Sequence, residues 1–184
     1  MRDGRRTLIL LAAIFGVLLA ATLLRNRSSE PAEAPTLNDL PFERVFPTLT
    51  DGDIQAVRLQ NLADDSFLTL VRDETGQWAA PDIPGVLDQE IAALIVRTVV
   101  ILPVQGVFGL EGNPDLRDYG FNPDGNLLIQ IVLTNGTQHG IVVGGIAPSG
   151  NGVYALVDSQ PSMYLLERAA IAFLVAQIQS PPTA

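Results

Sequence analysis

The chain has 184 residues, contains neither cysteine nor lysine, and has a single histidine, His139. Without cysteine it can form no disulfide, iron–sulfur cluster, c-type haem attachment or thiolate zinc site. One histidine also argues against a histidine-based metal site and against a Ser-His-Asp triad. We therefore expect no cofactor and no metal centre.

Positive charge is scarce outside the N-terminus. Five of the eleven arginines lie before residue 28, and six remain beyond it against nineteen acidic residues, a net charge near −13. A domain this acidic repels phosphate backbones and anionic headgroups. This charge excludes nucleic-acid binding and membrane binding through a basic patch.

The longest apolar run is Thr7–Leu24, TLILLAAIFGVLLAATLL, which follows Arg5 and Arg6 and precedes Arg25. At about 1.5 Å per residue, this helix would be roughly 27 Å long, enough to cross a bilayer. No small-residue cleavage site closes the run, so an uncleaved anchor is favoured over a signal peptide. The arginine bias places the N-terminus in the cytoplasm and the remaining chain in the periplasm of a bacterial inner membrane.

One face of this predicted helix carries a stripe of small residues, Ala12, Gly16 and Ala20. Such stripes allow membrane helices to approach closely. We expect the stripe to pack against integral membrane subunits, although alanine and glycine are also simply common in membrane helices.

The remaining chain predicts an α+β domain of antiparallel sheets with two apolar helices. We expect a cytoplasmic N-terminus at 1–6, a transmembrane helix at 7–25, a Pro- and Glu-rich linker at 26–40, the domain at 41–180 and a tail at 181–184. Alternation and turn residues predict strands at 43–46, 54–60, 66–72, 77–80, 127–134, 137–143, 153–157 and 163–166, a helical turn at 114–119, and helices at 87–102 and 167–179.

Two further features of this domain follow from its pattern. Asn135-Gly136 predicts a type I′ hairpin turn. The segments 54–102 and 127–179 each read as a strand meander followed by one apolar helix, which suggests two repeated halves.

Both predicted helices are apolar nearly all round, a pattern that indicates burial on more than one side. If the domain cannot cover them alone, the uncovered part marks a partner interface. The residues expected at this interface are Val96, Val99, Val100, Phe173 and Leu174. The alternative is that both helices are packed inside the domain's own core.

Several turns and strands resemble a bacterial family of domains of unknown function, numbered 4340. The matching features are Trp78 before Pro81, the turn Tyr119-Gly120-Phe121-Asn122-Pro123, and the strand entry Gly152-Val153-Tyr154. Phe121 stands where the family usually has leucine. The resemblance covers most of residues 45–178 and implies a membrane-tethered, extracytoplasmic β-rich domain, found in some members with exporter-type ABC systems. It implies no activity and no catalytic residues.

The candidate chemical sites all have a simpler structural interpretation. The carboxylate pairs Asp51/Asp53 and Asp64/Asp65 lie in predicted turns and match no calcium loop. The glycine-rich segment 144–152 precedes a strand rather than a helix, so it predicts a hairpin connection and not a phosphate cradle. We expect His139 to be an ordinary polar-face residue of its strand. The sequence thus offers no catalytic, cofactor-binding or metal-binding residue.

These observations favour a non-catalytic, single-pass membrane-anchored accessory or scaffolding subunit of a larger membrane protein complex. Two hosts fit: an electron-transfer complex of a respiratory or photosynthetic membrane, and an assembly associated with an ABC exporter. The alternative is an extracytoplasmic binding module for a small ligand or an envelope polymer, which predicts a concave polar pocket between the two halves. A hydrolase would need Ser and Asp within hydrogen-bond reach of His139.

Overall fold

The computed structural model describes residues 41–183, except 111–113, 122–124 and 159. The predicted anchor, the linker and the stripe of Ala12, Gly16 and Ala20 lie outside these residues. Within the described part of the chain, neither helix has the length and apolar character needed to cross a bilayer.

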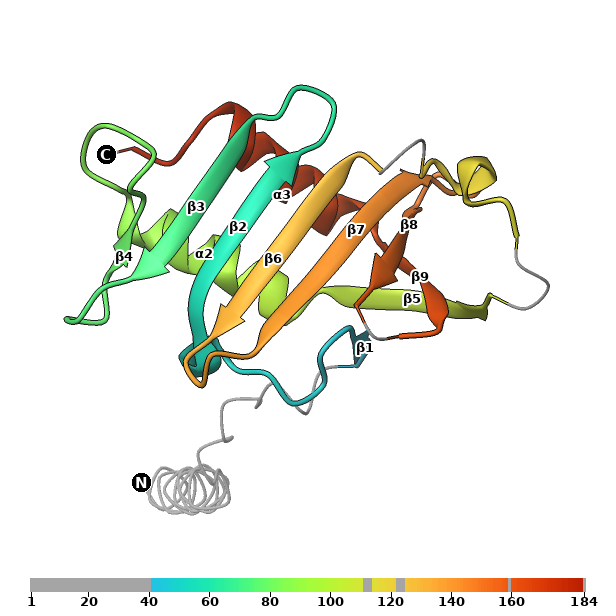
Figure 1. Ribbon diagram of the computed structural model, residues 1–184, viewed down its shortest axis with the longest axis horizontal. Helices are drawn as coiled ribbons and strands as arrows, with labels where there is room; N and C mark the ends of the chain where they lie inside the picture. The colour runs from blue at the N-terminus through green and yellow to red at the C-terminus, as the bar shows by residue number, and fades with distance from the viewer. Residues whose placement is uncertain (1–40, 111–113, 122–124, 159, 184) are drawn as a thin grey trace, which may run out of the picture. The chain divides into compact units, whose positions relative to one another are not determined.

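The domain is built on one nine-stranded antiparallel sheet with the order β1-β5-β9-β8-β7-β6-β2-β3-β4 (Figure 1). The α+β class is therefore confirmed, with a single sheet in place of several. The elements are β1 (Glu43–Arg44), η2 (Asp51–Asp53), β2 (Ile54–Asn61), β3 (Phe67–Arg72), β4 (Trp78–Ala79), α2 (Gln89–Val100), β5 (Pro103–Gly109), η3 (Leu116–Tyr119), β6 (Leu127–Leu133), β7 (Gln138–Ile146), β8 (Gly152–Val157), β9 (Ser162–Glu167) and α3 (Arg168–Gln179).

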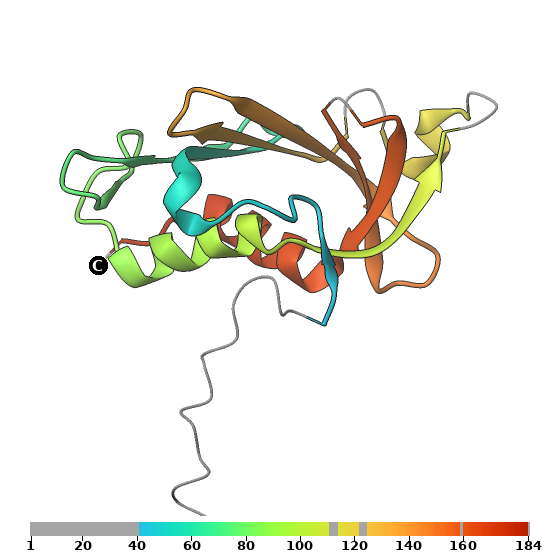
Figure 2. The ribbon, with the colours of Figure 1, turned by 90° about the horizontal axis from the view of Figure 1, so that it is seen from below.

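Alternation along the central strands directs one set of apolar side chains to the helices. Val57 and Leu59 of β2 and Ile129 and Ile131 of β6 are all at most 1% exposed. Their register partners alternate in the same way, which fixes the pairing because a slip of one residue would turn the whole set outward. Both helices pack on this one face of the sheet (Figure 2).

Helix α2 begins where Asp88 caps it, since the Asp88 carboxylate accepts hydrogen bonds from the backbone N–H groups of Glu90 and Ile91 at 2.9 and 3.1 Å. It ends before Pro103, which cannot continue a helix. In α3 the buried residues Ile171, Leu174 and Ile178 follow helical spacing. The outer face of α2 is exposed, with Leu94 at 46%, so burial on both sides of this helix was a wrong expectation.

Strand β5 has no counterpart among the predicted strands. It follows α2 directly and crosses to the far side of the sheet, where it pairs with β9 and, over two residues, with β1. Because β5 contains two glycines and lies near the edge of the sheet, its apolar residues hardly alternate. The alternation that predicts a strand is therefore weak in this part of the sequence.

The hairpin at Asn135-Gly136 is present, but its turn differs from the expected type I′. Only Gly136 has a positive φ, of 85°, whereas type I′ requires positive φ at both central residues. Gly136 N–H donates to the Leu133 carbonyl and Leu133 N–H to the Thr137 carbonyl, at 2.9 and 2.8 Å. This is a three-residue loop, a type I turn followed by a left-handed glycine.

The residues expected as a tail are bound to the domain. Thr183 forms a β-bridge with Leu87, and Asp88 N–H donates to the Pro182 carbonyl at 2.9 Å. The end of the described chain therefore lies against the start of α2.

Candidate functional site

The sheet face opposite the helices, here called the open face, is turned to the viewer in Figure 1. A row of paired residues crosses it from one edge to the other, in the order Phe67, Gln60, Leu128, Val142, Leu156, Met163 and Phe108. Six of the seven are apolar, and Phe67 and Phe108 at the two ends are 38% and 49% exposed. The segment around η3 packs on this face against β7 and β8, where the Tyr119 ring lies 5.0 Å from the Tyr154 ring, and it lines a hollow together with Met163 and Phe108.

Beside this row lies a polar hollow of about 520 Å³ over β2, β3, β6 and β7. The polar residues that line it are Arg58, Thr69, Gln130, Gln138, His139 and Asp158. His139 pairs with the core residue Ile131, so its imidazole is directed to the helix face and not into the hollow. It spans the junction of the two halves, where β2 and β6 pair in register from Ala56 to Asn61. The halves are therefore not separated by a cleft, and the concavity lies on the outside of their junction.

One side of the hollow is positively charged. The guanidinium carbon of Arg58 lies 4.0 Å from the centroid of the Phe67 ring, a cation–π arrangement. Within the described residues, the one ion pair is Arg117–Asp115, so Arg58 has no carboxylate partner there. Next to it, the Thr69 hydroxyl is buried without a hydrogen bond.

The other side carries Asp158, which occupies space left by a glycine. Asp158 N–H donates to the Gly140 carbonyl at 2.9 Å, and a Cβ on Gly140 would lie 2.5 Å from Asp158 Oδ2. The hollow thus places a cation and an anion at its ends, with the amides of Gln130 and Gln138 between them. Such a lining can hydrogen-bond a small polar molecule, and it holds no activated nucleophile.

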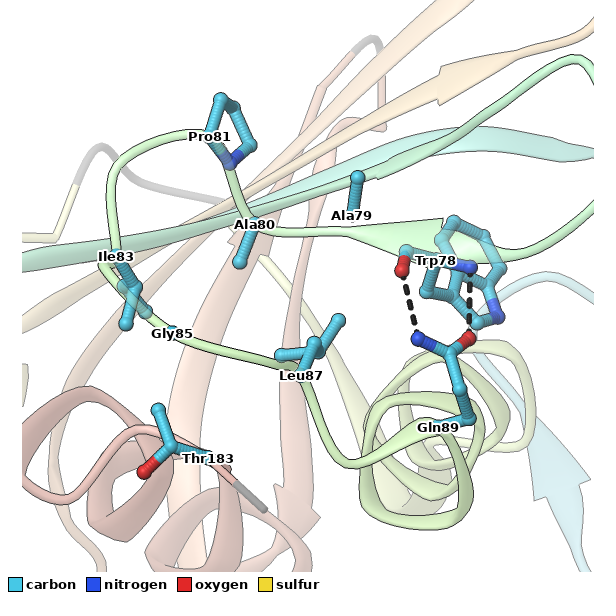
Figure 3. A pocket seen from close by; sticks show the side chains of 9 residues that line it. All are labelled: Trp78, Ala79, Ala80, Pro81, Ile83, Gly85, Leu87, Gln89 and Thr183. Carbon is cyan, nitrogen blue, oxygen red and sulfur yellow. Dashed lines mark hydrogen bonds between the residues drawn. The ribbon is translucent and has the colours of Figure 1, made fainter.

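A second, smaller hollow of about 270 Å³ lies between β4 and the start of α2 (Figure 3). Its walls are mostly apolar, from Trp78, Ala80, Ile83 and Leu87, and Thr183 closes one side. The Gln89 side chain reaches back to the Trp78 backbone, with its oxygen accepting from Trp78 N–H at 2.9 Å and its nitrogen donating to Trp78 C=O at 2.8 Å. No charged group enters it.

A third hollow of about 390 Å³ lies between α3 and the ends of β6, β7 and β8. Its lining is largely apolar, including Leu127, Val143, Ile171 and Val175, with Arg168 as the charged member. The Arg168 guanidinium donates to the Gly150 carbonyl at 2.9 Å, so this cation holds a turn.

The paired aspartates form turns, as predicted. Asp53 accepts from the Thr50 hydroxyl and the Thr50 N–H at 2.7 and 2.8 Å, and these bonds lower the pKa of Asp53. Asp64 accepts from the Ser66 hydroxyl at 2.6 Å and from Ser66 N–H at 3.0 Å, which lowers its pKa. Across the described residues, no three potential metal ligands gather in one place.

The glycine-rich segment joins β7 to β8 by a tight turn, as predicted for a hairpin connection. The Ala147 N–H donates to the Gly152 carbonyl and the Gly150 N–H to the Ala147 carbonyl, at 2.9 and 2.8 Å. Gly144 has a different role, because a Cβ there would lie 2.9 Å from the Phe121 ring. Because Gly144 has no side chain, the turn after η3 can pack closely on the open face.

His139 packs against an aromatic ring. Its imidazole centroid lies 4.9 Å from that of Phe46, with the two planes at 39°. Within the described residues it forms no hydrogen bond with a serine or an aspartate.

The expected partner interface on the helices is wrong for four of its five residues. Val96, Val99, Val100 and Leu174 are at most 1% exposed and belong to the core between helices and sheet. Phe173 is half-buried and packs against the same core. These residues agree with the alternative expectation, in which both helices pack in the domain's own core.

The open face and its hollow were missed by sequence reasoning. The signal was available in part, since Gln60, Leu128, Val142 and Leu156 hold the outward positions of predicted strands. The order of the strands was needed to join them into one row. Comparison of the chain with models of known protein families, with curated proteins and with solved structures finds no match.

Proposed function

We propose that this chain is a non-catalytic accessory subunit of a larger membrane protein complex, anchored by residues 7–25 with its domain in the periplasm. The observation that supports this most is the open face. A sheet with helices on one side only leaves a row of mainly apolar side chains on its other face, partly exposed from Leu128 to Leu156 and exposed again at Phe67 and Phe108, with Gln60 as its polar member and Met163 buried. Apolar surface of this kind is typical of a partner interface.

In this proposal the open face, and not the helix layer, meets the partner. Leu128, Val142 and Leu156 are half-buried at the centre of the row, where a partner would remove the remaining apolar area from water. The host is an electron-transfer complex or an assembly associated with an ABC exporter, and the chain contributes docking surface without a cofactor. The two halves, β2 to α2 and β6 to α3, are on this view a repeated unit that builds one wide sheet.

The test is purification of the tagged full chain from its own membrane in mild detergent, followed by native mass spectrometry. We expect a stoichiometric second polypeptide with the wild type, and its loss with Val142→Arg, which places a charge in the middle of the row. Ala93→Arg on the exposed face of α2 is the matched control and should retain the partner. Recovery of this chain alone, in any oligomeric state, would overturn the proposal.

The polar hollow supports a second candidate, a binding module for a small polar ligand or a polar envelope polymer. Its convergent groups, Arg58, Gln130 and Asp158, suit a ligand with an anionic group at one end and hydrogen-bond donors at the other. Native mass spectrometry of the full chain released from detergent would detect a retained small molecule, and Arg58→Gln should lose it. Arg97→Gln, on the outer face of α2, is the control.

A further inference from the structure

We infer that two copies of this chain pair through their β5 strands, in an antiparallel arrangement with Val107 on a two-fold axis. This inference does not depend on the proposed function. It rests on the unpaired length of β5 and on the lack of charged residues along this strand.

At the β4 end of the sheet a side chain closes the last strand, while Phe67–Leu70 of β3 extend past β4 without a neighbouring strand among the described residues. Gln89 forms hydrogen bonds with both the N–H and the C=O of Trp78, which takes the place of a further strand. Proteins commonly protect exposed sheet edges in such ways, because unpaired backbone groups can pair with another chain.

The β5 end has no equivalent protection along most of its length. Strand β1 pairs with Pro103 and Val104 only, and residues 41–42 before it form a bend and no strand. Residues 105–109 therefore have no neighbouring strand on this side within the described residues. Val107 and Phe108 in this stretch are both 49% exposed.

The composition of this edge also suits a second copy. The chain from Thr98 to Leu110 contains no charged residue, whereas the rest of the domain is strongly acidic. Two such domains repel each other over most of their surface, so an uncharged strand is a place where they can approach. An antiparallel edge is also complementary to itself, and two-fold dimers are the commonest oligomers.

Symmetry and β1 together define the register. A two-fold axis perpendicular to the sheet keeps each side chain on the same face of the sheet in both copies. Paired residues in an antiparallel ladder share a face, so the residue at the axis must pair with the same residue of the second copy. With Val107 on the axis, Gln105 pairs with Gly109 of the second copy and Gly106 with Phe108. A shift to Gly106 would bring the second copy onto Pro103, where β1 already lies, and a shift to Phe108 would shorten the ladder.

The side chains fit this register on both faces. Phe108 of each copy lies opposite Gly106 of the other, so the ring meets a residue without a side chain. The two Val107 side chains meet on the face that carries the helices. The β1 strand of each copy would lie beside the β5 pair.

The test uses the absence of cysteine in the chain, because a single introduced thiol is then unambiguous. Directly opposed Cα atoms in an antiparallel pair are about 4.5–5.5 Å apart, within the range of a disulfide. Under mild oxidation of the full chain in detergent, Val107→Cys should form a covalent dimer about a hundredfold faster than Val86→Cys, an exposed position outside the sheet, because pairing raises the effective thiol concentration.

Gln105→Cys is the register control. Its thiol would lie four residues, roughly 13 Å, from its own copy along the strand, so it should cross-link no faster than Val86→Cys. Light scattering of the unmodified chain should give two copies, and Val107→Lys should give one. Equal cross-linking rates for the three cysteine variants would overturn the inference, and so would a Val107→Cys variant that stays monomeric under oxidation. A light-scattering mass above two copies would also overturn it, because it would indicate that β5 pairs with the unpaired part of β3 in another copy.

Discussion

The side-chain amide of Gln89 pairs with the backbone of Trp78 as a neighbouring strand would, through two hydrogen bonds of 2.9 and 2.8 Å. It joins the first turn of α2 to the last strand of the sheet. This one residue therefore occupies the outer side of β4 and links it to the helix that Asp88 caps (Figure 3).

Gln89→Leu should destabilise the domain by about 1–3 kcal/mol, because it leaves the partly buried Trp78 N–H and C=O without hydrogen bonds. Gln89→Glu retains the acceptor and loses the donor, so its effect should be smaller. Urea unfolding followed by circular dichroism measures both. Glu90→Gln, at the neighbouring exposed position, is the control, and a loss as large as that of Gln89→Leu would contradict this role for Gln89.

The buried faces of the two helices give a second prediction. Leu174→Ala should lower the free energy of unfolding by about 2–5 kcal/mol, because Leu174 is 0% exposed and its removal leaves a cavity in the core. Leu94→Ala, at a position 46% exposed on the outer face of α2, should change it by no more than about 0.5 kcal/mol. If Leu174→Ala and Leu94→Ala changed the free energy of unfolding equally, Leu174 would be a surface residue, as the sequence hypothesis of a helix interface expects.

The contrast between buried Leu174 and exposed Leu94 shows which parts of the fold can be predicted from the sequence. Alternation in β2 and β6 and the apolar spacing of α2 and α3 predicted where these elements lie, because their side chains are buried by one regular pattern. Whether Val99 and Leu174 face a partner or the sheet depends on the strand order, since a nine-stranded sheet is wide enough to cover both helices.

Strand β5 and the Asn135-Gly136 turn were harder for a related reason. Gly106 and Gly109 give an edge strand almost no alternation, and its pairing with β9 comes from residues more than fifty positions away in the chain. The same Asn-Gly pair fits a two-residue or a three-residue loop, and the register Val132 to Gln138 selects the longer one. The polar hollow depends likewise on the strand order, which places Arg58 of β2 and Asp158 after β8 at the two ends of one hollow.

The turn that follows η3 gives a third prediction. Gly120 has a φ of 82°, and a Cβ on it would lie 2.3 Å from the Gly145 nitrogen. Gly136 has nearly the same φ, of 85°, with no atom within 4 Å of such a Cβ. Gly136→Ala should therefore cost only the left-handed backbone strain, about 1–2 kcal/mol, while Gly120→Ala should cost clearly more.

The difference between these two alanine variants isolates the close packing of this turn on β7. Thermal unfolding of both, at the same protein concentration, is the measurement. Equal stability of Gly120→Ala and Gly136→Ala would contradict the close packing of this turn on Gly144 and Gly145, and with it the burial of Phe121.

The turn between β3 and β4 gives a prediction about pH. Asp73 accepts hydrogen bonds from the Thr75 hydroxyl at 2.7 Å and from the N–H groups of Thr75 and Gln77 at 2.8 and 3.0 Å. The bond from the Thr75 hydroxyl is the main cause that lowers the pKa of Asp73. Burial is the next largest cause and opposes it, and the backbone hydrogen bonds lower the pKa further. The charged carboxylate is therefore favoured by folding.

A group whose pKa is lower in the folded state stabilises the fold fully above its unfolded pKa, about 3.9 for aspartate, and loses this contribution as the pH falls through the folded value. Asp73→Asn should thus be less stable than the wild type at neutral pH, and the difference should shrink below about pH 4. Urea unfolding between pH 7 and pH 2, followed by Trp78 fluorescence, measures it. Glu74→Gln is the control, because Glu74 accepts no hydrogen bond within the described residues, and its difference from the wild type should not follow this course. A gap between Asp73→Asn and the wild type that widened as the pH fell would show that the carboxylate opposes this turn.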